Sequence, residues 1–144
     1  MKPIRSPFFF LRVVRRRRRT RRPVSGSRLY SLHKEAARVR VHEKLLVWNA
    51  LYGFKYNKVA IRNTRSRWGS CSRAGNLNFN YKLLFIPERL FDYVIVHELC
   101  HLKEFNHSRA FWDLVAKTIP DYAERRHELR ALRKVNVPRE PLTP

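Results

Sequence analysis

The sequence predicts one α+β domain, in which a small antiparallel sheet or hairpin packs on a central helix and further helices follow. Two observations lead to this fold class. Residues 58–62 and 76–81 alternate between apolar and polar side chains, as strands with one buried face do. Four other segments place apolar side chains at helical spacing: residues 31–52, 87–103, 108–117 and 121–133. With 144 residues, the chain is long enough to build one modest hydrophobic core.

The first predicted helix covers residues 31–52 and has the pattern of an amphipathic helix. Its apolar residues recur at spacings of three, four and seven, with charged residues between them: Leu32, Ala36, Val39, Leu46 and Ala50. His33 and His42 also lie in this helix. Neither has a neighbour at the spacing of metal ligands, so we expect both at the surface.

The segment after this helix predicts a β-hairpin. Residues 58–62 form a short strand, a polar stretch follows, and Ala74-Gly75 marks a turn. Residues 76–81 then place three apolar side chains on one face and three asparagines on the other. The asparagine face fits two interpretations. It belongs either to a strand that holds an extended peptide by backbone pairing or to an ordinary sheet with a polar outer face.

The central helix, predicted from Pro87 to Lys103, carries the motif His97-Glu98-x-x-His101. Residues four apart stack on one helix face, so the two histidines can bind one metal ion. Glu98 lies about 100° round the helix, where a carboxylate reaches water bound to the metal. This is the zinc metalloprotease motif. The alternative is a satisfied polar cluster in a buried helix, since apolar residues surround the motif and buried polar groups need partners.

A catalytic zinc site usually has three protein ligands, and two residues are candidates for the third. Glu104 shares the helix face of His97 but lies about 10 Å along the axis from it, too far for one ion while the helix continues. His107 follows the expected turn, where Asn106 suits a left-handed conformation. We therefore expect His107 to complete a site for one catalytic Zn²⁺. The spacing from His97 to His107 equals that of the metzincins, but Glu104 replaces their glycine and no methionine follows for their Met-turn.

The motif belongs to one of four blocks that extend over residues 52–132. They are YGFKYNKVAIRNTRSRWGSCS, GNLNFNYKLL, DYVIVHELCHLKEFNHSRAFW and PDYAERRHELR. Together they resemble the YgjP-like metallopeptidase domain, a relative of the SprT-like zincins. The resemblance implies a zincin-type α+β fold. It also implies zinc bound by His97, His101 and His107, with Glu98 as the catalytic acid and base.

The chain is strongly basic, with 32 Lys and Arg against 11 Asp and Glu. Residues 1–28 hold eleven basic and no acidic residues, so we expect a disordered basic arm that phosphate backbones would attract. An unstructured leader without a role is the alternative. Residues 29–136 would form the metallopeptidase domain, and residues 137–144 a disordered tail. The apolar run at residues 8–11 is too short for a signal peptide or a transmembrane helix, so we expect a cytoplasmic protein.

Two functions are compatible with these observations. The first is a zinc-dependent peptidase acting on a peptide or protein, in which Glu98 takes a proton from water and delivers it to the leaving amine. Arg65, Arg67 and Tyr93 are candidates, by residue type, to stabilise the oxyanion or contact the substrate. The second is a nucleic-acid-associated basic protein with a structural or latent metal site, because arginines beside Trp68 suit single strands. Both combine in a protease recruited to nucleic acid. A closed structural site typically has four ligands, and the sequence offers three, which favours the enzyme.

Overall fold

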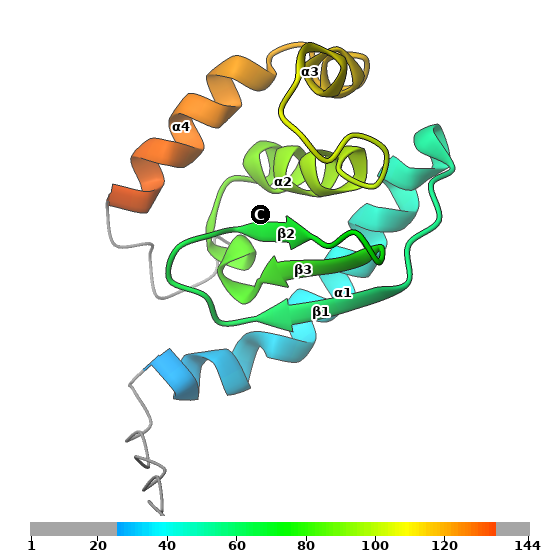
Figure 1. Cartoon of the computed structure of the whole chain (residues 1–144). Coiled ribbons are helices and arrows are strands. Elements are labelled where there is room, and N and C mark those ends of the chain that lie inside the picture. Colours follow the sequence, from blue (N-terminus) through cyan, green and yellow to red (C-terminus); the bar gives the residue numbers. More distant parts are fainter. Residues whose placement is uncertain (1–25, 135–144) are drawn as a thin grey trace, which may run out of the picture.

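The computed structural model describes residues 26–134 as one sheet surrounded by helices (Figure 1). In chain order the elements are α1 (Gly26–Tyr52), β1 (Lys58–Arg62), β2 (Gly69–Cys71), β3 (Asn76–Asn80), the 3-10 helix η1 (Tyr81–Phe85), α2 (Glu88–Cys100), α3 (Arg109–Ala116) and α4 (Tyr122–Lys134). The α+β prediction is confirmed. The basic arm expected at residues 1–28 lies outside the described residues except for its last three, which begin α1. The tail expected at residues 137–144 lies wholly outside them.

The sheet has three strands in the order β1-β3-β2, and only one of its two pairings is antiparallel. The hairpin predicted from residues 58–62 and 76–81 is wrong, because β1 pairs in parallel with β3. The antiparallel hairpin is formed by β2 and β3, with Cys71 opposite Leu77. The sequence pattern did not predict β2, because this strand lies in the stretch interpreted as a polar loop. The chain reverses direction before and after β2, so β1 and β3 run the same way. Gly75, with φ of +73°, makes the second reversal, and its amide N–H donates to the carbonyl of Ser72 at 2.9 Å.

β3 packs one face on the core and uses its last asparagine to hold a loop. Leu77 and Phe79 are fully buried, as the alternation predicts. Asn80 is also buried, although the pattern places it on the polar face. Its amide nitrogen donates to the backbone oxygens of Thr64 and Arg67, at 2.8 and 3.1 Å. Asn80 of the central strand β3 therefore holds the segment that leads into β2.

The buried face of α1 differs from the face that the sequence pattern indicates. Leu32, Val39 and Leu46 are 59–73% exposed, and the core contacts come from the fully buried residues Ala37, Val41 and Leu45. Polar contacts to α2 explain this rotation. Trp48 donates from Nε1 to Asp92 at 2.9 Å, and the Lys44 ammonium lies 2.8 Å from the same carboxylate. Lys44 and Trp48 lie beside the buried residues of α1, so their contacts to Asp92 turn those buried residues toward the core. His33 also differs from expectation, since it is half-buried against Phe85.

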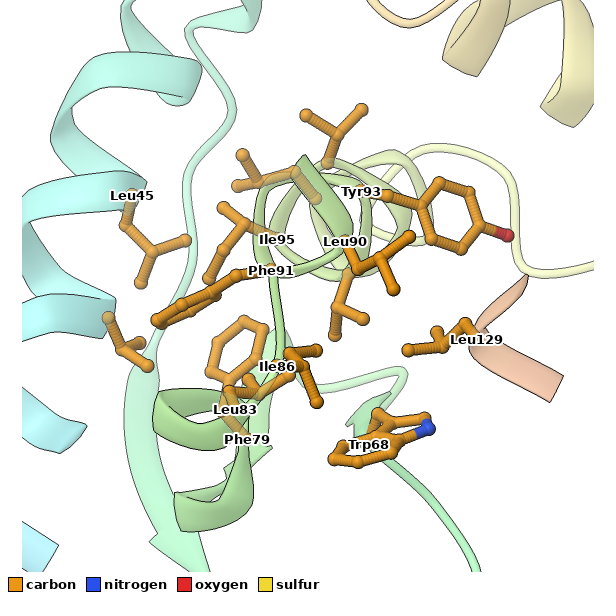
Figure 2. Close-up of a cluster of buried hydrophobic side chains, with 14 of the residues drawn as sticks. Leu45, Trp68, Phe79, Leu83, Ile86, Leu90, Phe91, Tyr93, Ile95 and Leu129 are labelled. Carbon is orange, nitrogen blue, oxygen red and sulfur yellow. The ribbon is translucent and has the colours of Figure 1, made fainter. Parts of the chain in front are cut away.

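α2 is the central helix of the fold and is buried along most of its length (Figure 2). Pro87 is its N-cap, and the α-helix ends at Cys100, three residues before the predicted end, where a turn over residues 101–103 takes over. Figure 2 shows its core side chains between α1, the sheet and α4: Leu90, Phe91, Tyr93 and Ile95 from α2, with Leu45, Trp68, Phe79 and Leu129 around them. The end of α2 that carries the histidine motif is thus held rigidly by the core.

None of the helices within residues 26–134 combines the length and the apolar character needed to cross a membrane.

Candidate metal centre

The end of α2 and the turn after it bring three imidazole rings together. The Nε2 atoms of His97, His101 and His107 form a nearly equilateral triangle with sides of 3.1, 3.2 and 3.2 Å. Zinc binds imidazole nitrogen at about 2.0–2.1 Å, and two ligands of a tetrahedral ion at that distance are about 3.3–3.4 Å apart. The triangle therefore has the size of one face of a tetrahedral zinc site. Within the described part of the chain, these three residues are the cluster that can hold a metal ion, and Glu104 is not part of it.

Hydrogen bonds at Nδ1 orient two of the three imidazole rings. His101 Nδ1 lies 2.9 Å from the carbonyl oxygen of Glu104. A carbonyl only accepts, so Nδ1 carries the proton and Nε2 keeps its lone pair for a metal. His97 Nδ1 lies 3.3 Å from the Tyr93 hydroxyl. Burial, followed by the neighbouring imidazoles, lowers the pKa of His97 to about 3, so this ring is neutral at physiological pH, as a metal ligand must be.

Aromatic packing, rather than a left-handed asparagine, positions His107. No non-glycine residue within residues 26–134 has a positive φ, so the conformation predicted for Asn106 is wrong. His107 instead stacks on Trp112, with ring centres 5.5 Å apart and planes at 22°. Ser108 follows as the N-cap of α3, where its hydroxyl accepts from the amide of Phe111 at 3.4 Å. The start of α3 therefore fixes the direction in which His107 leaves the turn.

Glu98 lies beside the triangle and is almost completely buried, with 5% of its surface exposed. One carboxyl oxygen, Oε2, has no hydrogen-bond partner in the protein. Burial raises the pKa of Glu98 to about 8, although the positive charge of Arg67 opposes the shift. Such an oxygen needs a polar partner, which a reacting water molecule or substrate would supply.

Gly69 of β2 makes room for this carboxyl group. A Cβ atom at Gly69 would lie 2.6 Å from Glu98 Oε1 and 2.7 Å from its Cγ, closer than such atoms approach in proteins. The edge strand of the sheet and the motif helix are thus in direct contact at Glu98. Sequence reasoning missed Gly69, because the contact joins residues 29 positions apart and has no signal in the local pattern.

A cleft of about 340 Å³ is lined by His97 and His107 of the triangle and by Glu98. Of the three substrate-contact candidates, Arg67 and Tyr93 line this cleft, whereas Arg65 lines only a neighbouring pocket of about 460 Å³, which shares residues 66–69 with the cleft. The structure therefore does not bring Arg65 to the histidines. Burial raises the pKa of Tyr93 to about 12, and its hydroxyl lies at the Nδ1 side of His97, which suits a role in orienting that ring.

The opposite wall of the cleft comes from residues that sequence reasoning did not select. They are Trp112 of α3 and Arg126, Leu129 and Arg130 of α4. The Arg126 guanidinium lies 4.8 Å above the Trp112 ring, within cation–π distance. The spacing of the two arginines places them on one face of α4, but only the tertiary structure shows that this face meets the histidines.

Comparisons with known proteins identify the architecture. The family model of the YgjP-like metallopeptidase domain matches residues 12–132. The structure is similar to the metallopeptidase zymogen abylysin of Pyrococcus abyssi, with 25% identity and a TM-score of 0.59 over 68% of this chain and 99% of abylysin. It is also similar to the zymogen jannalysin of Methanocaldococcus jannaschii, with 24% identity and a TM-score of 0.51 over 69% of this chain and 96% of jannalysin. No match was found among curated proteins.

Proposed function

Because the chain belongs to the YgjP-like metallopeptidase family, we propose that it is a zinc-dependent peptidase in which His97, His101 and His107 hold the metal. The observation that carries the proposal is the triangle of imidazole nitrogens, with sides of 3.1–3.2 Å, next to a buried carboxyl group. Three protein ligands leave a fourth position open, which distinguishes a catalytic zinc site from a closed structural one.

Bound zinc would supply Lewis-acid chemistry, which polarises the substrate carbonyl and makes water a nucleophile near neutral pH. Glu98 would act as the general base for that water and then as the acid that protonates the leaving amine. Burial places its pKa far above that of an exposed carboxyl group, and a cation nearby would lower it again toward neutrality. A group with a pKa near the working pH both accepts and returns a proton efficiently.

The sheet supports a peptide substrate, but through a different strand from the one considered in the sequence. β3 has β1 on one side and β2 on the other, so its asparagines cannot offer a free edge for backbone pairing. β2 is an edge strand, and its first residue, Gly69, lines the cleft. An extended peptide that pairs with β2 would bring its backbone beside Glu98.

The nucleic-acid alternative receives less support from the described residues. It rested on the excess positive charge, on the arginine run of the arm and on Trp68 beside Arg65 and Arg67 as a partner for bases. Trp68 is 9% exposed and packs in the core, as Figure 2 shows, so its ring is not available for stacking. The basic arm lies outside the described residues, and its attraction to nucleic acid stays a prediction.

The test is hydrolysis of a quenched fluorescent peptide library by the zinc-loaded full chain and by its Glu98→Gln variant. We expect the variant to lose at least about 100-fold in kcat while it binds zinc as the parent does. Glu35→Gln is the matched control, since Glu35 is exposed on α1 and pairs only with Arg38. If Glu98→Gln with bound zinc cleaved peptides as fast as the parent, the proposed role of Glu98 would be wrong.

A further inference from the structure

Three arginine side chains line the cleft. Arg67 enters from the loop before β2, and Arg126 and Arg130 enter from successive turns of α4. None of them forms an ion pair with a carboxylate of the described residues. Within residues 26–134, Glu98 is the one acidic side chain that lines the cleft, and it is buried. The walls of the cleft are therefore strongly cationic.

Asp121, which directly precedes α4, and the acidic residues of α4 all form ion pairs with arginines. Asp121 accepts from Arg125 at 2.9 Å, and Glu124 and Glu128 both lie against Arg89 of α2. The acidic residues at α4 therefore form ion pairs away from the cleft. Arg126 and Arg130, which have no ion pair within residues 26–134, line the cleft.

The position of Arg126 is fixed, since its guanidinium lies over the Trp112 ring that stacks on His107. The Trp112 ring thus holds this guanidinium close to the metal site. Positive charges so close to a cation site repel the metal, and an anionic ligand would relieve that repulsion.

We propose that Arg126 and Arg130, with Arg67 on the opposite wall, select peptide substrates that carry a carboxylate beside the scissile bond. Guanidinium groups bind carboxylates through paired charge-assisted hydrogen bonds, which gives this recognition both affinity and direction. The inference rests on the proposed peptidase function and adds the substrate class. Such a carboxylate can come from either of two sources, an aspartate or glutamate side chain or the free C-terminus of a peptide.

A phosphate backbone is the competing anion, and the shape of the site favours the peptide. The cleft holds about 340 Å³, and the edge of β2 runs beside it, which suits one extended chain rather than a duplex. The neighbouring Trp68 is buried and offers no stacking surface to bases.

The test compares matched peptides with the full zinc-loaded chain. One pair differs only by Glu against Gln at each position around the cleaved bond, and a second pair differs by a C-terminal acid against an amide. We expect kcat/KM to be about 10- to 100-fold higher for one of the acidic forms, mainly through KM. The Arg126→Gln, Arg130→Gln double variant should reduce this ratio to about one. Arg109→Gln, an exposed arginine outside the cleft, is the control that should keep the ratio.

A binding measurement keeps the inference testable if hydrolysis is not observed. Zinc-loaded Glu98→Gln protein is titrated with the same peptides, and Kd should be about tenfold lower for the acidic form and should lose this preference in the double arginine background. Absence of hydrolysis with the preference intact would contradict the peptidase function alone. Equal binding of acidic and neutral peptides would overturn the carboxylate proposal. Displacement of the peptide by a single-stranded oligonucleotide that binds more tightly would assign the arginines to phosphate instead.

Discussion

Replacement of Gly69 by alanine would test how the edge strand and the motif helix cooperate at Glu98. The new Cβ would lie 2.6 Å from Oε1, 2.7 Å from Cγ and 2.9 Å from Cδ of Glu98. Ordinary contacts of a Cβ begin at about 3.4 Å, so the carboxyl end of Glu98 must retreat by about 0.5–0.8 Å. β2 is hydrogen-bonded to β3 and cannot absorb the overlap easily, so most of the movement falls on the glutamate.

The size of the effect follows from that displacement. A misplacement of about 1 Å at a reacting group costs on the order of 100-fold in rate. We therefore expect Gly69→Ala to lower kcat by about 30- to 100-fold while zinc affinity stays within about twofold, because the three atoms nearest to the new Cβ all belong to Glu98. In the Glu98→Gln background the same substitution should add little, since both changes act on one group.

The assay is steady-state hydrolysis of the best library peptide, with zinc content measured on the same samples. Gly75→Ala provides the matched control. It makes the same chemical change at a glycine with φ of +73° whose Cβ would find its nearest neighbour at 3.5 Å, so it should lower stability and leave kcat nearly unchanged. Full activity of Gly69→Ala would refute the claim that this glycine sets the position of Glu98.

Two further predictions concern pH and the metal. In the metal-free protein, the folded state holds the Glu98 proton up to about pH 8, whereas the unfolded chain releases it near its ordinary pKa of 4.5. The retained proton of Glu98 therefore stabilises the folded protein fully below pH 4.5, and this stabilisation is lost as the pH rises toward 8. His97, with its pKa lowered to about 3 from 6.5, acts in the opposite direction but only below pH 6.5. Between pH 6.5 and 8 the free energy of unfolding should therefore fall by about 2 kcal/mol, as measured by urea titration. A Glu98→Gln protein with the same slope would contradict this assignment. Separately, His107→Ala should weaken zinc binding by on the order of 100-fold or more in a competition titration with a chromogenic chelator. His33→Ala, which only removes packing on Phe85, should not, and equal affinities for the two variants would remove His107 from the ligand set.

The clustering of the three histidines was predictable from the sequence because these residues are close together in the chain. Helical spacing alone brings His97 and His101 to one side, and a ten-residue separation lets His107 return to them. The conformation of the turn was not predictable in the same way. Stacking on Trp112 and capping by Ser108 decide it, and both are contacts between side chains rather than backbone preferences.

The remaining differences arise from contacts between distant segments. Val39 and its helical neighbours gave α1 an apolar face, but Lys44 and Trp48 rotate that face toward solvent by bonding to Asp92 of α2. Polar partners on another element leave no periodic signal in the sequence. The same limitation hid Arg126 and Arg130, since nothing in the pattern of α4 shows which of its faces closes the cleft.

The separation in the chain between the histidines and Gly69 has a consequence for folding. The imidazoles lie within residues 97–107, whereas the glycine that accommodates Glu98 lies 29 positions before it. A short loop closes at a lower entropic cost than a long one, and the free energy of metal binding adds to the free energy of folding. The proposed zinc ligands therefore need only α2 and the turn after it to come together, and not the docked sheet. A folding intermediate with only these elements would hold the ion but leave Glu98 unconstrained, so the ability to hydrolyse peptides would be acquired later in folding than the ability to bind metal.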